Sequence, residues 1–410
     1  MGAAYEALDV TSLPLRLGGL AVLADRLGPS SGWKVREVGD GNLNLVFIVE
    51  GARGAAVVKQ ALPYVRLVGD SWPLPLSRAY FEHEALVRQA ARDPGRVPEV
   101  HHFDRDQALI VMEFLSPHRI LRGKLIDGER VADLGAVLGR FCARTAFRGS
   151  DLAMNPAAKK ADTALFLGNV ALCDISEQLV FTDPYFDAPR NHHTPDLTPV
   201  VARLRADSAV RDAAQAMLLR FTSGSETLCH GDLHTGSVMC TDTDTRVIDP
   251  EFGFVGPMGF DLGMLLANFL MAFFCQPAHR ADPAPMQDWL LSVITDCVTA
   301  FRDEFALLWR TERRGILYPD TLLPGEAALG SVLSHVWMDA MGFCGCEMHR
   351  RCLSLAHNAD FERIGDTALR ARLEARNLMM GRQLLVERDS VPDAVALVAL
   401  ARDYNGRDFA

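Results

Sequence analysis

Hydrophobic and polar residues alternate along the first part of the chain in short runs that predict β-strands. Three such runs, Trp33–Val38, Leu43–Val49 and Ala55–Gln60, are separated by turns that contain glycine, a pattern that predicts a three-stranded antiparallel sheet. A further apolar run, Leu109–Phe114, predicts another strand. Ahead of them, apolar positions recur at helical spacing through Ala3–Leu27, so we expect a leading helix there.

The apolar positions take the period of a helix further along the chain. One helix is expected at Ala79–Ala91. The longest apolar run, Met264–Cys275, falls short of the roughly 20 residues that span a bilayer and predicts a buried helix. Five longer stretches follow the helical period: Val131–Ala146, Lys159–Leu179, Leu197–Phe221, Met286–Trp309 and Ala327–Leu355. A sheet followed by helices predicts an α+β fold. The length allows two lobes, and the only plausible boundary is near Leu115, between residues 1–115 and residues 116–410.

Composition and charge narrow the class of protein. The chain has 410 residues, of which 49% are hydrophobic and 23% are charged, as in globular proteins. Its net charge of −10 offers no uniform positive field, so no nucleic-acid partner is expected. The N-terminal segment lacks a basic start followed by an apolar core, which argues against a secretory signal. No membrane partner is expected either.

Nine cysteines, an odd number, lie mostly inside apolar runs, as expected for a reduced cytoplasmic protein. Cys344, Cys346, His349 and Cys352 could suggest zinc, but their spacing matches no paired-cysteine zinc knuckle. We therefore expect a helix lined with small cysteines at this position.

Candidate catalytic residues are concentrated in the segment HGDLHTGS and the hairpin predicted after it. Asp232 lies in the loop, and the hairpin ends at Asp249 and Glu251, because Pro250 between them stops an interior strand. Three loop carboxylates in this order suit phosphoryl transfer from Mg-ATP. Asp232 would orient the acceptor hydroxyl, while Asp249 and Glu251 would hold Mg²⁺. A lone turn aspartate is as often simply solvated, and it is the combination that favours catalysis.

A second group of candidate residues lies in the first lobe. Gly39 and Gly41 flank a turn where the backbone could approach nucleotide phosphates, although an ordinary hairpin turn fits the same residues. Lys59 ends the third strand and could reach the α- and β-phosphates. The next helix carries Glu82 and Glu84, and a kinase needs one of them to hold the lysine; the sequence leaves both open.

The strand near residue 110 runs into a Ser-Pro pair, as a hinge between two lobes would. Adenine would pair there with the backbone of Glu113, Phe114 and Leu115, which leaves their side chains free to be apolar. An ordinary buried strand fits the same run.

Taken together, these segments resemble a known family. HGDLHTGS, IDPEF and GPMGFDLG look like the catalytic and metal loops of the aminoglycoside-phosphotransferase-like branch of the protein-kinase fold. More closely, they and the segments GDGNLNLVFIV and VVKQALPYVR are similar to the 5-methylthioribose kinases, over nearly the whole chain. The resemblance implies a nucleotide-binding N-lobe and a C-lobe with the catalytic, metal and sugar sites. It also implies ATP contacts at Asn42, Lys59 and the segment Asp249, Pro250 and Glu251.

The resemblance further implies a function and two substrate residues. The function is ATP-dependent phosphorylation of the 1-hydroxyl of 5-methylthioribose in methionine salvage, by a cytoplasmic homodimer. Family members carry an arginine pair like Arg350 and Arg351, one of which contacts the sugar. Adjacent helical residues point about 100° apart, so we expect one arginine in the cleft and the other solvated or paired with Glu347.

Two other functions are compatible with the same motifs. A related kinase could act on choline, homoserine or an aminoglycoside, and an aminoglycoside would need an acidic pocket. A nucleotide-binding scaffold without activity would be expected to lack Asp232, Lys59 or Asp249, and all three are present.

Overall fold

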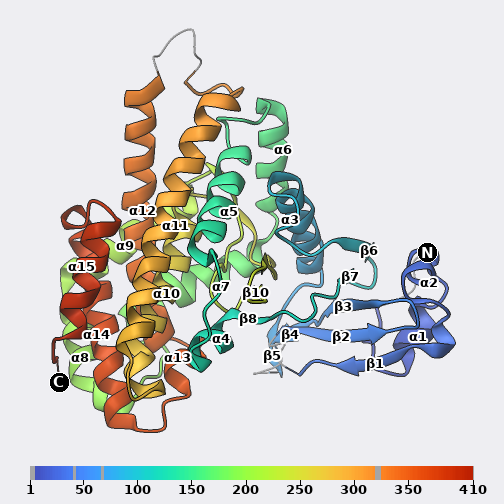
Figure 1. The fold of residues 1–410 in the computed structure, drawn as a ribbon, viewed down its shortest axis with the longest axis horizontal. Helices are drawn as coiled ribbons and strands as arrows, with labels where there is room; N and C mark the ends of the chain where they lie inside the picture. Colours follow the sequence, from blue (N-terminus) through green and yellow to red (C-terminus); the bar gives the residue numbers. More distant parts are fainter. Residues whose placement is uncertain (1–4, 40–42, 66–68, 319–324, 410) are drawn as a thin grey trace.

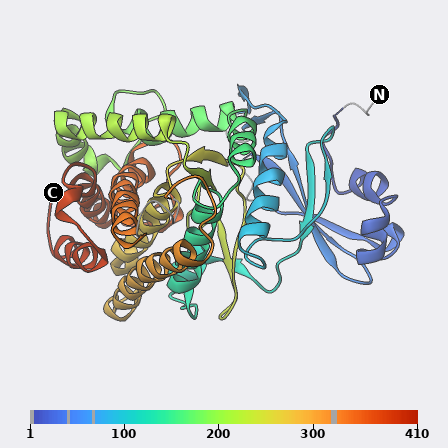
Figure 2. The same cartoon turned by 90° about the horizontal axis from the view of Figure 1, so that it is seen from above.

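Two lobes lie side by side along the long axis of the protein (Figures 1 and 2), one built on a β-sheet and the other mostly helical. The structure is a computed structural model that describes residues 5–39, 43–65, 69–318 and 325–409. The N-terminus lies beside the sheet lobe and the C-terminus at the far end of the helical lobe. The predicted α+β arrangement of two lobes is confirmed.

A five-stranded antiparallel sheet of order β1-β2-β3-β7-β6 forms the first lobe. Its strands are β1 (Lys34–Glu37), β2 (Asn44–Glu50), β3 (Ala55–Ala61), β6 (Val100–Asp104) and β7 (Leu109–Glu113). A two-stranded ribbon of β4 (Tyr64–Val65) and β5 (Gly69–Pro73) follows β3. The predicted three-stranded start and the later strand are therefore confirmed, with no end shifted by more than one residue.

The leading helix expected over Ala3–Leu27 is wrong as one continuous element. The described part contains two short helices, α1 (Ser12–Leu17) and α2 (Ala21–Leu27). Glycine is a poor helix former, and a Cβ at Gly18 would collide with Ser30 Oγ, so the chain breaks at its Gly-Gly pair. Leu13 and Leu17 of α1 and Leu23 and Leu27 of α2 pack with the outer face of the sheet in a core of their own.

The inner face of the first lobe has only a small apolar cluster of its own among the described residues, formed by Ala61, Ala79 and Ala108. Helix α3 (Arg78–Arg92), predicted as Ala79–Ala91, lies between the sheet and the helical lobe (Figure 1). Its Leu86, together with Ile110 and Met112 of β7, is buried in the same apolar cluster as the helices of the second lobe. The two lobes are therefore joined by shared hydrophobic packing.

The helical lobe is built around α10 (Phe260–His279), whose middle turns are completely buried. By length and composition α10 alone among the described helices could cross a membrane, but 89% of its apolar window is buried inside the protein, as in a core helix. Around it lie α4 (Leu121–Asp127), α5 (Leu134–Arg148), α6 (Pro156–Phe166), α7 (Val170–Phe181), α8 (Thr198–Ala206), α9 (Ser208–Ser223), α11 (Ala284–Thr311), α12 (Gly325–Leu353), α13 (Ala359–Glu362), α14 (Thr367–Val386) and α15 (Ala394–Asn405).

Two of the predicted helices are each divided in two. The stretch Lys159–Leu179 forms α6 and α7, which meet at an angle of 73°, and Gly168 lies in the break. The stretch Leu197–Phe221 forms α8 and α9, because the carboxylate of Asp207 accepts the Ala209 N–H and caps a new helix. Sequence periodicity continues through both breaks and so did not reveal them.

Short strands in the second lobe carry the segments expected to be catalytic. They are β8 (Arg119–Ile120), β9 (Thr227–Cys229), β10 (Val238–Cys240), β11 (Thr245–Val247) and β12 (Phe254–Gly256). Strands β10 and β11 form the predicted hairpin, and β9 pairs with β12. The first strand after Leu115, β8, already pairs with β10.

Candidate active site

The loop that carries Asp232 follows β9 and is held rigidly. Gly231 has a φ of 88°, and a Cβ on it would collide with the carbonyl of Phe252, so glycine is required. Asp261, in the first turn of α10, accepts the N–H of His230 at 2.7 Å and that of Gly231 at 3.1 Å. The sequence showed Asp261 only as part of GPMGFDLG, and its support of this loop was missed.

Both carboxylate oxygens of Asp232 are held by cationic or N–H donors. Oδ1 lies 3.0 Å from Arg351 Nη2 and 3.4 Å from Arg350 Nη1, and Oδ2 lies 3.3 Å from His234 Nε2. Burial alone would raise the pKa of Asp232, but His234 and the two arginines hold that pKa well below its ordinary value. Asp232 is therefore an ionised, weakly basic and well-oriented carboxylate.

His234 has one protonation pattern that fits its neighbours. Its Nδ1 accepts the backbone N–H of Gly236 at 3.0 Å, so the ring proton of the neutral form is on Nε2, facing Asp232. Burial lowers the pKa of His234, which favours this neutral form. Ser237 Oγ donates to the backbone oxygen of Asp232 at 2.9 Å. We did not single out His234 from the sequence, where it is one histidine among 12.

Lys59 lies between two acids, Glu82 and Asp249. Its Nζ is 2.8 Å from Glu82 Oε1 and forms a second ion pair with Asp249. Burial alone would lower the pKa of Lys59, but Asp249 and Glu82 raise it above its ordinary value, so the lysine is charged. Glu84 pairs with Arg88 on its own helix. The structure therefore selects Glu82 as the partner of Lys59.

Glu251 is buried against the first lobe by a network that the sequence did not reveal. Its Oε2 accepts from Arg78 Nη1 at 2.8 Å and from Asn44 Nδ2 at 3.0 Å. Arg78 is 1% exposed and also donates to the backbone oxygens of Leu43 and Leu62. The backbone of Glu251 is held by Asn169 of the helical lobe, whose Nδ2 donates to its oxygen at 2.9 Å.

Three of these acids could together hold a cation. One carboxylate oxygen each of Glu82, Asp249 and Glu251 lies within 4.8 Å of the others. In the described part of the chain, both hydrogen bonds to the Glu251 side chain end on Oε2, so Oε1 remains for a metal. Hard oxygen donors of this kind suit Mg²⁺. Pro250 separates Asp249 from Glu251 and is buried.

The other residues expected to bind ATP are only partly described. Gly39 lies in a turn after β1, whereas Gly41 and Asn42 fall outside the described residues. At the expected hinge, the N–H of Glu113 donates to Glu99 O at 2.8 Å, so this N–H is already used. Of the other two hinge residues, Phe114 is half-buried and Leu115 is buried.

The expectation that only one arginine of the pair enters the site is wrong. Arg350 and Arg351 are 6% and 5% exposed, and both reach the same oxygen of Asp232. Both also pair with Glu347, one turn earlier on α12. Long side chains can converge although their Cβ atoms diverge, because several rotatable bonds separate the Cβ from the guanidinium.

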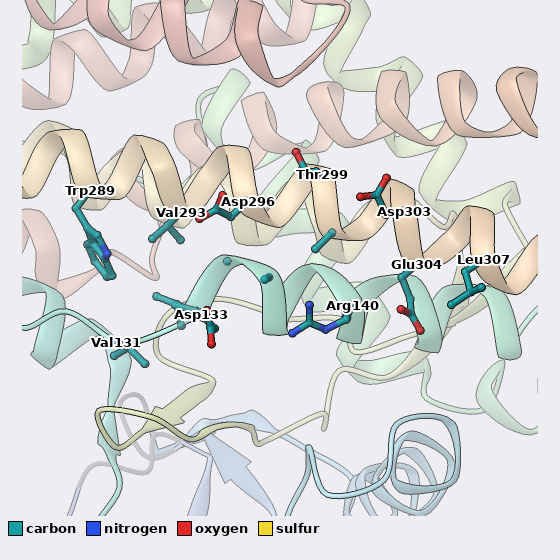
Figure 3. Close-up of a pocket in the computed structure, with 14 residues that line it drawn as sticks. Val131, Asp133, Arg140, Trp289, Val293, Asp296, Thr299, Asp303, Glu304 and Leu307 are labelled. Atoms are coloured by element: carbon teal, nitrogen blue, oxygen red, sulfur yellow. The ribbon is translucent and has the colours of Figure 1, made fainter.

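The groove of about 510 Å³ between α5 and α11 is separate from this site (Figure 3). Asp133, Asp296, Asp303 and Arg140 line it, and it includes none of the residues predicted for catalysis or binding. Cys344, Cys346 and Cys352 are buried in α12, the helix that also carries Arg350 and Arg351. Its His349 contacts Tyr185 Oη and Leu378 O.

Known proteins match this chain over most of its length. Residues 34–289 match the phosphotransferase enzyme family. The chain is 42% identical over 400 residues to a methylthioribose kinase of Escherichia coli, covering 93% of this chain and 94% of that protein. It is 39% identical over 393 residues to methylthioribose kinase 1 of Oryza sativa subsp. japonica, covering 93% and 91%.

A solved structure shares the fold. A glucosamine kinase in complex with glucosamine, ADP and inorganic phosphate matches with a TM-score of 0.50 at 16% identity, covering 93% of this chain and 87% of that one. The two-lobed architecture is consistent with these matches. The chain belongs to the methylthioribose kinase family.

Proposed function

We propose that the protein transfers the γ-phosphoryl group of ATP to the 1-hydroxyl of 5-methylthioribose, a step of methionine salvage. The observation that carries the proposal is the placement of Asp232, an ionised carboxylate with both oxygens oriented, beside two buried arginines. The near-full-length identity to methylthioribose kinases supports the choice of acceptor. Phosphoryl transfer depends chiefly on positioning and charge stabilisation, which such a site supplies.

Each residue of the site has a proposed role in this reaction. Asp232 accepts a hydrogen bond from the acceptor hydroxyl and takes its proton as the new bond forms. Lys59, held by Glu82, binds phosphate oxygens. Asp249 and Glu251 would hold Mg²⁺, which when bound neutralises charge on the phosphates. The spacing of their oxygens fits such an ion.

We also propose the placement of ATP and the division of the chain. Gly39, Gly41 and Asn42 would cover the phosphates, and the backbone of Glu113, Phe114 and Leu115 would receive adenine, in an N-lobe of residues 1–115. The rest of the chain would form the C-lobe with the sugar site. The change of sheet after Leu115, from the large sheet to the pair of β8 with β10, supports this boundary.

A cytoplasmic homodimer is the proposed state of the protein. All nine cysteines are free thiols, and eight of them are buried, which agrees with a reducing compartment. The dimer rests on the resemblance to the family, and light scattering after gel filtration would measure it.

An ATP-consumption screen over methylthioribose, choline, homoserine and kanamycin tests the proposed acceptor. We expect ADP release that depends on methylthioribose and a much lower kcat/KM for the other three. Faster turnover of choline, homoserine or kanamycin would replace the proposal by one of the alternative kinase functions.

Glu251→Gln is expected to raise the magnesium concentration needed for half-maximal activity by roughly tenfold, because a neutral amide is a weaker ligand than a carboxylate. The amide oxygen can still accept from Arg78, so the fold should be kept. Magnesium titrations at saturating ATP measure the effect. Glu84→Gln is the matched control, since Glu84 lies on the neighbouring helix but pairs with Arg88. Equal magnesium requirements in both variants would remove Glu251 from the metal site.

Arg350→Ala and Arg351→Ala are expected to affect different kinetic constants. Arg351 is firmly held, with Nε 2.6 Å from Glu347 Oε1 and Nη2 3.0 Å from Asp232, so its loss should misplace Asp232 and lower kcat. Among the described residues, Arg350 makes its contacts at 3.3 and 3.4 Å through Nη1 alone, which leaves donors for the sugar. Its loss should raise the KM for methylthioribose by about tenfold, at unchanged KM for ATP.

Steady-state kinetics with each substrate varied in turn distinguish these effects. Arg370→Ala, which removes another ion-paired arginine of the helical lobe, is expected to leave both constants unchanged. Wild-type constants in both active-site variants would place the sugar elsewhere.

A further inference from the structure

A chain of buried polar contacts extends from Asp232 into the interior of the helical lobe. The two arginines that hold Asp232 share one acid, Glu347, which is 0% exposed. Behind Glu347 lies Asn268 of α10, and behind that lies Arg122 of α4. Helices α4, α10 and α12 therefore meet at a polar network directly beneath the candidate active site.

Glu347 is the centre of this network. Its Oε1 accepts from Arg351 Nε at 2.6 Å and from Asn268 Nδ2 at 3.2 Å. Its Oε2 accepts from Arg350 Nη1 at 3.3 Å. Both carboxylate oxygens are thus used, and the donors approach from two helices, so the position of the carboxylate is well determined.

The orientation of Asn268 is also determined. Its Oδ1 accepts from Arg122 Nη2 at 2.9 Å, and its Nδ2 donates to Met264 O at 3.0 Å. The amide therefore presents its N–H side to Glu347. Arg122 is in turn 3.1 Å from Asp360 Oδ2, and Asp360 is 0% exposed. Arg122 on one side and Glu347 on the other thus prevent a flip of the Asn268 amide.

Stability alone does not account for an arrangement of this kind. A buried Arg-Glu-Arg cluster costs several kcal/mol in lost hydration per ion, and its internal attraction often no more than offsets that cost. Apolar side chains of similar size would serve packing at least as well. The cluster is, however, well suited to fixing the direction of two guanidinium groups.

The need for Glu347 follows from the charges at Asp232. Two like charges that converge on one carboxylate repel each other, and with Asp232 as sole counterion they would draw it away from an acceptor hydroxyl. Glu347 shares the positive charge, so that Asp232 can keep a hydrogen-bonding position for the substrate. The formal charges of the network cancel, because three arginines face three acids. These are Arg122, Arg350 and Arg351 on one side and Asp232, Glu347 and Asp360 on the other.

We infer that Glu347 is a positioning residue, which acts through Arg350 and Arg351 to set the place of Asp232 and of the sugar; this rests on the proposed function. Asn268 is its support from α10. Neither residue touches the reacting atoms, and both act by limiting the directions that the arginines can take.

Glu347→Gln tests the inference, because it keeps the shape but removes the charge and directs amide N–H groups toward guanidinium donors. We expect kcat/KM for methylthioribose to fall about tenfold or more, with the KM for ATP within about twofold of wild type. Glu347→Asp keeps the charge on a shorter stem and should recover part of the loss. A purely structural role would give no such separation between the two substrates and no recovery.

Glu374→Gln is the matched control. Glu374 is also 0% exposed and pairs with an arginine four residues away, Arg370, at 3.0 Å. We expect this variant to lower the melting temperature comparably and to leave the kinetics unchanged. Wild-type kinetics in Glu347→Gln, or an equal change in both variants, would overturn the inference.

The test also covers a variant that does not fold and a wild-type protein that does not use methylthioribose. If Glu347→Gln does not fold, Glu347→Asp and Asn268→Ala carry the same test, and failure of all three to fold would show that Glu347 serves the fold. If the wild-type protein does not turn over methylthioribose, the proposed function fails by itself. Glu347→Gln is then measured with whichever acceptor the screen identifies, where the same selective loss is expected.

Discussion

An Asp232→Asn variant is expected to lose at least about 10²-fold in kcat while its affinity for ATP stays near that of wild type. Asparagine has almost the same shape, but it cannot take up the proton of the acceptor hydroxyl. Its neutral side chain would also leave Arg350 and Arg351 without one of their two counterions. Kinetics with a coupled ADP assay measure the first effect, and calorimetric titration with ATP measures the second.

Asp242→Asn serves as the control for Asp232→Asn. Asp242 lies in the turn between β10 and β11, and its side chain is 86% exposed and pairs with Lys124. We expect wild-type turnover in this variant, because exposed ion pairs contribute little. Full activity of Asp232→Asn in the same assay would mean that another group positions the acceptor.

An Arg78→Met variant is expected to lose about 3–5 kcal/mol of unfolding free energy, since it leaves the buried carboxylate of Glu251 without its cationic partner. Arg78 is 1% exposed and joins Asn44, Glu251 and two backbone oxygens. Activity should fall as well, because Glu251 would be free to turn away from the metal position. Thermal unfolding followed by circular dichroism should show a Tm roughly 5 °C lower.

Arg310→Met makes the corresponding change at a surface ion pair. Arg310 contacts Glu326 through Nε at 2.8 Å and Nη2 at 2.7 Å, but their side chains are 54% and 68% exposed. We expect a loss of less than about 1 kcal/mol. Equal Tm values for the two variants would contradict the role given to Arg78.

The catalytic segment could be predicted from sequence because its chemistry is local. The loop around Asp232 and the hairpin that ends at Asp249 are each a short run with its own turn residues, so their order in the chain is informative. Which of Glu82 and Glu84 pairs with Lys59 could not be predicted in this way. Residues two apart on a helix face nearly opposite sides, and which side meets Lys59 depends on how α3 docks on the sheet.

Residues whose role depends on distant segments were missed. Arg78 is simply the first residue of a helix in the sequence, and its partners come from two strands of the first lobe and from the loop of Glu251. The positions of the Arg350 and Arg351 guanidinium groups were mispredicted for a similar reason. Helical geometry predicts the direction of each Cβ, whereas the meeting of Arg350 and Arg351 on Asp232 is decided by the acids around their far ends.

The hydrophobic packing shared between the lobes limits how chimeric enzymes can be assembled from this protein and its relatives. An exchange of segments at Leu115 would cut at the change of architecture, yet it would bring foreign surfaces against Leu86, Ile110 and Met112, which are buried with the helical lobe. Core surfaces tolerate such mismatches poorly. A graft confined to α1, α2, β1 and β2 would leave this packing between the lobes unchanged. The buried leucines of α1 and α2 belong to a different cluster. The natural unit of exchange is thus the outer part of the sheet lobe, smaller than the lobe itself.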